Sequence, residues 1–355
     1  MKTWKLEDTI LQKLVASNFS KLAFHIDRTN DDIEARILKL ARRHRVTNLL
    51  PCSSFFNQDS LATIAQSKTI MTQRQLQVLG ILKALLPKLE EAELPYAVVK
   101  GSDLAFRFYA HPAERIYSDI DLLIDLQNFE RYEYIFNQCG YQLRKQPSNS
   151  QGGEFYAPQF GVIIDTDSIG NFKPERYEMP HGQLSYFGLP PVQLLIYLSE
   201  HGAKHAWCRL QWIYDIALLL QSMKDSELQD SLARSQGQGS SHKVRVAISL
   251  ATYLFPVDSE PMLRLPFLQA LCTRFLLRRL FVMENPLRMA PITLFVRAGL
   301  EDSWYARLKL LGRKFFSPTD RDYQFLKLPH TLNVFYPMVR PVRIFRQLMT
   351  NRNAT

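Results

Sequence analysis

The chain has 355 residues, of which 46% are hydrophobic and 22% are charged. This is the balance of an ordinary globular protein of two or three domains, and it excludes a chain that is disordered throughout. The net charge of +10 fits a partner rich in phosphate, whether nucleotide, nucleic acid or acidic lipid headgroup, and it equally fits a basic surface that only keeps the protein in solution.

The four cysteines lie far apart in the sequence and form no C-x-x-C pair. Neither a zinc site nor a disulfide framework is therefore indicated, and a reducing cytoplasm is the expected location. The apolar runs are far shorter than the roughly 20 residues that cross a bilayer or, between Met262 and Met283, are interrupted by arginines. We therefore expect no membrane span.

Residues 1–94 are predicted to be mostly helical, because apolar residues recur at near-helical spacing. The third helix of this region is expected to run from about Asp59 to Glu93, and Pro87 could kink or split it. The pattern changes at Pro95, so we place the first domain boundary there.

Residues 95–188 alternate short β-prone runs with helical stretches, which is the pattern of a small α/β or α+β unit. The strand candidates are residues 96–99, 117–124 and 161–167, with weaker ones at 141–143 and 153–157, and helices are expected at 103–109 and 128–139.

Residues 189–355 are predicted to be helical again. The tail beyond Pro286 is basic and aromatic, which could serve RNA binding, but it contains no recognisable RNA-binding motif, and a plain docking surface is favoured. The predicted fold class is therefore α+β, with a small mixed sheet in residues 95–188 flanked by helical regions in residues 1–94 and 189–355. The helices of the last region are expected at about 190–207, 209–223, 225–235, 241–254 and 260–283.

Asp119 and Asp121 carry the strongest chemical signal in the sequence. They stand two residues apart in a strand candidate, so both carboxylates lie on one face of the sheet, with Ile120 and Leu122 on the other. Such a pair repels, and a divalent cation such as Mg²⁺, which prefers carboxylate oxygens and leaves positions for triphosphate oxygens, relieves that cost. Asp165 lies on a later strand candidate and is the third acid expected to join them. All three are predicted to be catalytic residues and metal ligands.

The turn Lys100-Gly101-Ser102 is the predicted phosphate site. A strand that ends in this turn and enters a helix presents free backbone amides, which suit phosphate together with the helix dipole. Gly101 permits a tight turn and a close approach, and the hydroxyl of Ser102 could bind a phosphate oxygen. Lys100 adds positive charge, and Arg115 could hold phosphate in a bidentate way.

His201 and His205 stand four residues apart on a predicted helix, a spacing that can bind zinc, but no third ligand of the expected kind is near. We expect both to line the cleft opposite the acids or to pack with Trp207. Lys204 could meet phosphate in the same cleft, and a solvated face explains it equally well. Asp215 on the next helix is expected to pair with one of these cations.

Two blocks of sequence resemble a known family. Residues 99–105 (VKGSDLA), Tyr109, Arg115 and residues 118–124 (SDIDLLI) resemble the bacterial family often described only as uncharacterised nucleotidyltransferase, within the DNA polymerase β-like superfamily. Residues 189–216 resemble the helical half of the same family, so that the resemblance covers about residues 95–220.

This resemblance implies a metal-dependent transfer of a nucleoside monophosphate from a nucleoside triphosphate such as ATP to an acceptor hydroxyl. The cofactor would be Mg²⁺ or Mn²⁺, and the acceptor a small metabolite, a sugar, a protein side chain or an RNA end. Asp119 and Asp121 match the metal-binding pair of the family, Asp165 matches its third acid, and Lys100, Gly101, Ser102 and Arg115 match its turn and basic positions.

Two other hypotheses stay open. After the third acid the family tends to have His and then Trp, where this chain has Asp167 and Ser168. That departure motivates a nucleotide-binding regulator or scaffold that has lost turnover. The other hypothesis is a toxin-like enzyme that modifies transfer RNA, which predicts a basic C-terminal surface continuous with the cleft.

Overall fold

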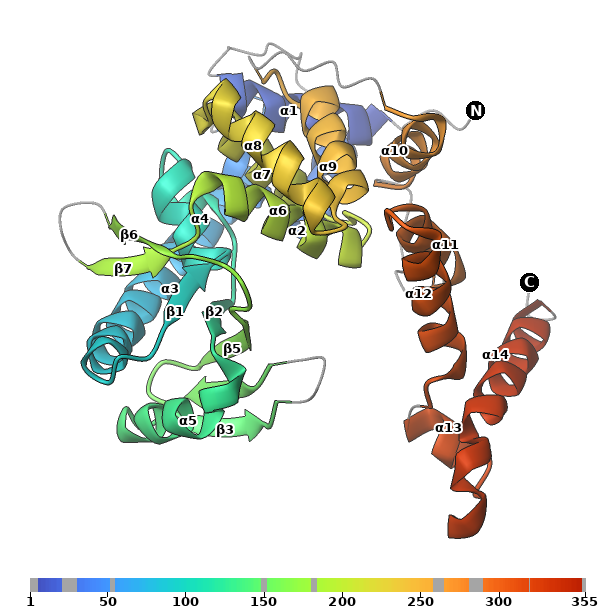
Figure 1. The fold of residues 1–355 in the computed structure, drawn as a ribbon. Helices are drawn as coiled ribbons and strands as arrows, with labels where there is room; N and C mark the ends of the chain where they lie inside the picture. Colours follow the sequence, from blue (N-terminus) through green and yellow to red (C-terminus); the bar gives the residue numbers. More distant parts are fainter. Residues whose placement is uncertain are drawn as a thin grey trace.

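The computed structural model describes residues 6–20, 31–51, 55–147, 152–179, 184–257, 265–280, 290–318 and 320–352. Within these ranges the chain forms a mixed sheet with helices packed against it, and a group of C-terminal helices that extends away from the rest (Figure 1). The predicted α+β class is therefore confirmed.

The seven strands of the described residues follow the order β3-β4-β5-β2-β1-β7-β6. The centre consists of β1 (Tyr96–Val99), β2 (Asp119–Ile124) and β5 (Val162–Ser168), the strands that the sequence predicts most clearly. β2 runs antiparallel to β1 and parallel to β5. The outer strands are β3 (Gln142–Lys145), β4 (Glu154–Ala157), β6 (Glu175–Glu178) and β7 (Ser185–Gly188).

The sequence does not predict β6 and β7. Three of the four β6 side chains are exposed, so the strand lacks the alternation of apolar and polar residues that marks a half-buried strand. β7 is held instead by its neighbours, because it pairs parallel with β1, where Val98 faces Gly188, and antiparallel with β6.

One face of the sheet packs against α3 (Gln58–Glu91) and α5 (Phe129–Gln138). Ile120 and Leu122 are fully buried in this core, as the two-residue period of a strand predicts. α3 passes through Pro87 as one continuous helix, so the split that the proline allowed does not occur. The same period turns the acidic residues of β2 to the opposite face.

The opposite face meets a second, helical core that includes Val99 and Leu123 of the sheet. Buried side chains of α1 and α2 join this core, as does Ile64 near the start of α3, whereas α3 from Met71 onward belongs to the sheet core. Packing therefore groups the chain differently from the three predicted sequence segments. The helices of this second core are α1 (Leu6–Ser20), α2 (Asp31–His44), α6 (Pro191–Lys204), α7 (Leu210–Ser222), α8 (Asp225–Gly237), α9 (Ser241–Leu254) and α10 (Phe267–Leu280).

The five helices predicted between residues 190 and 283 correspond to α6–α10, and the two ends of the last prediction lie outside the described residues. The remaining helices are α4 (Gly101–Phe108), which follows β1, and α11 (Ala290–Gly299), α12 (Trp304–Phe316), α13 (Asp320–Phe325) and α14 (Tyr336–Arg352). We call residues 303–352 the C-terminal arm. No helix of the described residues is both long and apolar enough to cross a membrane.

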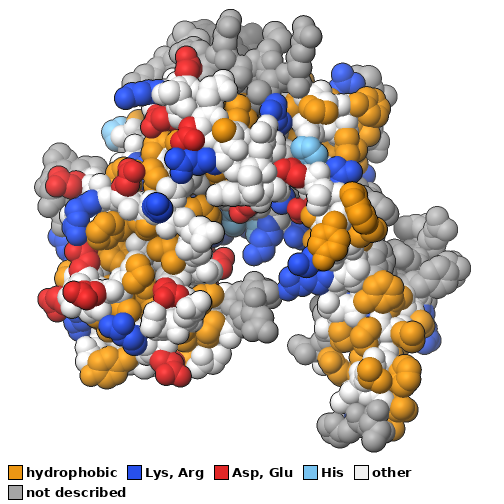
Figure 2. All heavy atoms as spheres, in the orientation of Figure 1, with side chains coloured by type: hydrophobic (Ala, Val, Ile, Leu, Met, Phe, Trp, Pro, Cys, Tyr) orange, Lys and Arg blue, Asp and Glu red, His pale blue; other side chains and the backbone are white. Residues whose placement is uncertain are grey.

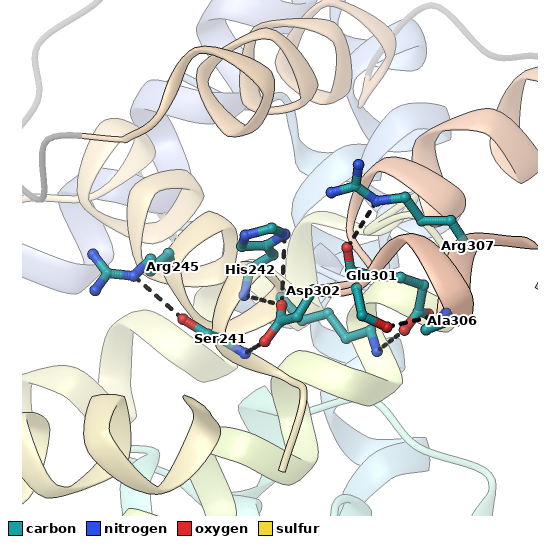
Figure 3. Close-up of polar contacts among 9 residues, drawn as sticks. Ser241, His242, Arg245, Glu301, Asp302, Ala306 and Arg307 are labelled. Carbon is teal, nitrogen blue, oxygen red and sulfur yellow. Dashed lines mark hydrogen bonds and ion pairs between the residues drawn. The ribbon is translucent and has the colours of Figure 1, made fainter. Parts of the chain in front are cut away.

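Acidic side chains fix the base of the arm to the helical core (Figure 3). Asp302 accepts hydrogen bonds from the backbone amides of Ser241 and His242, each at 2.8 Å, at the start of α9. A carboxylate at a helix N-terminus satisfies amides that have no partner inside the helix. Glu301 forms an ion pair with Lys243 at 2.8 Å, so two adjacent acids hold the beginning of α12.

His44 joins α2 to the start of α7. Its fully buried ring accepts a hydrogen bond at Nδ1 from the backbone amide of Leu210, at 3.1 Å. Burial, with the nearby charges of Arg43 and Arg209, lowers the pKa of His44 to about 3. The folded protein therefore keeps this ring neutral, while an unfolded chain protonates it near pH 6.5.

We expect stability to fall as the pH drops from about 6.5 towards 3, because the unfolded chain then binds a proton at His44 that the folded chain does not. At pH 5 this residue alone lowers the free energy of unfolding by about 2 kcal/mol relative to pH 7. Urea unfolding at both pH values measures the loss. His44→Asn should lessen it by that amount, whereas substitution of the exposed His111 by Asn should not. Equal losses in wild type and His44→Asn would contradict the assignment.

Candidate active site

The three predicted acids meet on the sheet face opposite α3 and α5. Asp119 and Asp121 stand on β2, and the parallel register of β5 places Asp165 directly beside Asp121. The antiparallel strand β4 then places Glu154 on the other side of Asp165. Four carboxylates from three neighbouring strands therefore gather on one face.

These acids line a cavity of about 470 Å³ between the sheet and α6. The strands supply the acidic wall, and α6 supplies a mixed wall of aromatic, basic and acidic side chains. The lining residues are Lys100, Asp119, Asp121, Leu122, Lys145, Gly152, Gly153, Glu154, Asp165, Thr166, Asp167, Tyr197, Glu200, His201, Lys204 and His205.

Lys100 forms an ion pair with an acid of the cavity wall. Its backbone has φ 54° and ψ −122°, a left-handed conformation that is costly for a residue with a side chain. The turn directs the ammonium back over the sheet, where Nζ lies 2.6 Å from Oδ1 of Asp121. Nζ also lies 5.6 Å from the ring centre of Tyr197 on α6. Lys100 thus joins the acidic wall to the helix.

Burial, together with the crowding of negative charge, raises the pKa values of Asp165 and Asp121. Burial, and then the charges of Asp121, Asp119 and Glu154, raise the pKa of Asp165 to about 6. Burial also raises the pKa of Asp121, against the opposing effect of Lys100. Carboxylate oxygens crowded in this way are the donor set that a divalent cation neutralises, so the chemistry of these residues fits Mg²⁺ or Mn²⁺.

The side chains are not yet arranged as a metal cluster. Among the described residues, no group of three or more His, Cys, Asp or Glu side chains stands ready to hold a metal ion. Asp121 is engaged with Lys100 instead. A cation bound by Asp121 would compete with Lys100 for its carboxylate.

Gly101 and Ser102 lie behind the cavity and are not among its lining residues. A Cβ on Gly101 would lie 3.1 Å from the ring of Tyr117 and 3.2 Å from the carbonyl oxygen of Asp119. Glycine thus permits the close approach of α4 to β2. Ser102 is buried, and its Oγ has no hydrogen-bond partner among the described residues. A contact of this hydroxyl with phosphate stays a prediction.

Arg115 does not reach the cavity, and its geometry corrects the predicted contact with phosphate. The guanidinium donates from Nε and Nη2 to the two carboxylate oxygens of Asp215 on α7, each at 2.9 Å. Nη1 donates to the carbonyl oxygen of Gly101 at 3.3 Å, and the hydroxyl of Tyr109 donates to Asp215 at 2.7 Å. Because both charges are buried and satisfied, we assign Arg115 to the joint between sheet and helices.

α6 presents one face to the cavity. Tyr197, His201 and Lys204 follow one another at the three- and four-residue spacing that places side chains on one side of a helix. The rings of His201 and His205 lie 4.9 Å apart, and both contact Trp212. Burial, followed by the charge of Lys100, lowers the pKa of His201 to about 2, so this ring is neutral.

Trp207, the other aromatic partner predicted for these histidines, is buried beneath α6. A Cβ on Gly202 would lie 2.2 Å from its indole nitrogen, so glycine at this position makes room for the ring. The histidines pack against Trp212, whereas Trp207 helps to hold the helix end in place.

Sequence reasoning missed several lining residues. Glu154 belongs to a weak strand candidate, and its place follows from pairing with β5, which no local pattern shows. Tyr197 stands four residues before His201 on α6, and Glu200 four residues before Lys204, so helical spacing was a usable signal for both. Gly152 passes so close to β5 that a Cβ would lie 1.6 Å from the carbonyl oxygen of Thr166, which explains why glycine stands there.

A family model described as "Uncharacterised nucleotidyltransferase" matches residues 31–256. No curated protein matches the chain. Among solved structures, the solution structure of the antibiotic-resistance factor ANT(2'')-Ia is similar at 14% identity and a TM-score of 0.37, over 46% of this chain and 94% of that one. An antigenic nucleotidyltransferase-like protein from Paracoccidioides brasiliensis is similar at 15% identity and a TM-score of 0.32, over 48% and 92%.

Arg115→Ala should lower the free energy of unfolding by about 3–5 kcal/mol, because it leaves the buried carboxylate of Asp215 without its counter-charge. Arg234→Ala is the matched control, since Arg234 forms an exposed ion pair with Asp230 and its loss should cost less than about 1 kcal/mol. Urea unfolding measures both. A stable Arg115→Ala protein that only binds triphosphate more weakly would restore the phosphate role.

Lys100→Gly should be more stable than Lys100→Ala by about 1–2 kcal/mol, because glycine adopts the left-handed backbone without strain while both variants lose the ion pair. The same pair of substitutions at Lys83, exposed in the interior of α3, should show the opposite order. Thermal unfolding of the four variants tests this. Equal stability of the two Lys100 variants would show that the turn relaxes at no cost.

Proposed function

The chain belongs to the uncharacterised nucleotidyltransferase family, and on this premise we propose that it transfers a nucleoside monophosphate from a nucleoside triphosphate to an acceptor hydroxyl, with a divalent cation bound at the acidic wall. The observation that carries the proposal is the register of β2 and β5, which brings Asp165 beside Asp121 on the face that also carries Asp119. A fold that only required a stable sheet would not concentrate carboxylates around a cavity, because their mutual repulsion is unfavourable.

The acids would hold the cation. Asp119, Asp121 and Asp165 are the residues that would bind Mg²⁺ or Mn²⁺, which supplies neutralisation of the triphosphate oxygens. Lys100 begins in an ion pair with Asp121 and has an ammonium free to turn towards a phosphate oxygen once that carboxylate binds the cation. Lys204, exposed on the facing helix, would add positive charge from the other wall.

The reaction itself is a displacement at the α-phosphorus. The acceptor oxygen forms a bond to phosphorus as the bond to the bridging oxygen breaks, and pyrophosphate leaves with the electron pair. The proton of the acceptor hydroxyl passes to a carboxylate oxygen of Asp165, which lies beside Asp121 and is half-buried at the cavity wall. The helix α6, opposite the acids, would position the acceptor and restrict access of water.

A second candidate function, a nucleotide-binding regulator or scaffold without turnover, is favoured by one observation. Lys100 lies 2.6 Å from Asp121 and neutralises its charge. The acidic wall is therefore stabilised without a bound cation. This candidate predicts binding of nucleotide without release of pyrophosphate, so the same assay separates it from the enzyme.

We expect the double substitution Asp119→Asn and Asp121→Asn to lower pyrophosphate release by roughly 100-fold or more, because the charges that hold the cation are lost. The assay supplies each of the four nucleoside triphosphates, labelled at the α-phosphate, with Mg²⁺ or Mn²⁺ and a cell extract as the source of acceptor. Transfer of label and release of pyrophosphate are measured together.

Asp230→Asn is the matched control, since this exposed carboxylate on α8 pairs with Arg234 outside the cavity and its removal should leave turnover unchanged. Equal turnover by the double variant and the wild type would contradict the proposed site. Nucleotide binding by the wild type without any pyrophosphate release would instead support the regulator.

A further inference from the structure

The positive charge of the chain is concentrated in the C-terminal arm. Residues 303–352 contain ten Lys and Arg residues and two Asp and Glu residues, so this segment carries eight of the ten net positive charges of the protein. One of the two acids, Asp322, is buried between Arg340 and Arg343 and is neutralised within the arm. The outer surface of the arm is therefore strongly basic.

The same arm exposes an unusual number of large apolar side chains. On α12, Trp304, Leu308 and Phe316 are spaced by multiples of four residues, and Trp304 is 72% exposed. A second row runs from the 3-10 turn of residues 330–335 into α14, with Val334 in the turn and Met338 four residues later on the helix, 75% and 67% exposed. Figure 2 shows such side chains gathered along the visible face of the arm. Contiguous apolar surface of this kind marks an interaction site.

Basic residues flank these apolar rows. On α12, the exposed residues Lys309 and Arg313 stand four residues apart, next to the row that contains Leu308. One turn beyond Val342, the row on α14 ends in the exposed Arg346. An apolar stripe bordered by Lys and Arg is the pattern of a helix that lies in the plane of a membrane surface, with the apolar side in the headgroup region and the cations at lipid phosphates.

We propose that the C-terminal arm docks this protein on the surface of a membrane that contains anionic phospholipids. The charge of the arm complements such a surface, since each Lys or Arg near it is attracted by the negative potential. A second copy of the chain would bring two basic arms together, which is unfavourable. RNA would match the charge, and Trp304 and Phe316 could stack on bases, but both rows also expose aliphatic residues such as Leu308, Met338 and Val342, which bases do not use and which suit the headgroup region of a membrane.

Docking of the arm would also hold the cavity of the proposed active site near the membrane. The base of α12 is fixed to α9 through Asp302 and Glu301, and Arg307 donates to the carbonyl oxygen of Glu301 at 3.1 Å (Figure 3). The arm is thus attached to the helical core by several contacts.

The test is sedimentation of the full chain with vesicles of phosphatidylcholine alone or of phosphatidylcholine containing one-third phosphatidylglycerol. We expect binding to the anionic vesicles, weak binding to the neutral ones, and a blue shift of tryptophan fluorescence as Trp304 enters the headgroup region. Lys309→Gln with Arg313→Gln should weaken binding by roughly tenfold or more, as should Leu308→Ser with Val342→Ser.

Two control pairs lie elsewhere on the surface. Ile70→Ser with Leu76→Ser removes exposed apolar residues from α3, and Arg42→Gln with Lys83→Gln removes exposed cations, and both should leave binding unchanged. Failure of the wild type to bind anionic vesicles, equal binding to both kinds of vesicle, or equal losses in control and arm variants would overturn the proposal. Binding of an RNA oligonucleotide through the arm without vesicle binding would also overturn it, in favour of a nucleic-acid surface.

Discussion

The buried ion pair of Arg115 and Asp215 holds the sheet and the helical half in one arrangement. The two residues are separated by 100 positions in the sequence, and the guanidinium meets both carboxylate oxygens at 2.9 Å. Removing two charges from water is costly, so such a pair is tolerated only when its remaining donors and acceptors are satisfied. Tyr109 and the carbonyl oxygen of Gly101 meet that condition. The pair therefore fixes geometry even where its net contribution to stability is small.

The acid-lined cavity between the sheet and α6 depends on that joint. Asp215 lies on α7, and α7 packs against α6, so holding α7 also holds the helix that forms the wall opposite the acids. Arg115 contacts the carbonyl oxygen of Gly101, next to the strained turn at Lys100. The Arg115–Asp215 ion pair thus supports the strained backbone of Lys100. A lysine keeps a left-handed backbone only where the surrounding contacts hold it there.

Local periodicity accounts for what the sequence could predict. Asp119 and Asp121 share a face because strands alternate, and the β-branched run around Ile163 marks β5 for the same local reason. The role of Arg115 could not be derived in this way, because its partner is identified only by packing across 100 residues. The same limit applies to Glu154, whose place beside Asp165 is set by strand pairing.

The grouping of the N-terminal helices shows the same limit at a larger scale. α1, α2 and α3 are equally helical in pattern, yet α3 from Met71 onward covers the sheet, while α1, α2 and Ile64 near the start of α3 join the core of α6–α10. Amphipathic spacing shows that a helix has an apolar side, and it does not show which element that side will meet. The domain divisions expected at residues 94 and 188 follow changes of local pattern, whereas the cores follow contacts between distant segments.

The net charge of +10 takes on a different meaning once its distribution is known. In the cavity, cations are matched by acids, since Lys100 pairs with Asp121 and five further carboxylates line the cavity beside Lys145 and Lys204. The unmatched charge lies in the C-terminal arm, where ten basic residues accompany two acids. The docking and the nucleotide chemistry that we propose would therefore be carried by separate parts of the chain. The net charge alone could not distinguish these two arrangements. A basic catalytic cleft with a neutral arm would give the same excess of positive charge as a basic arm with a balanced cleft.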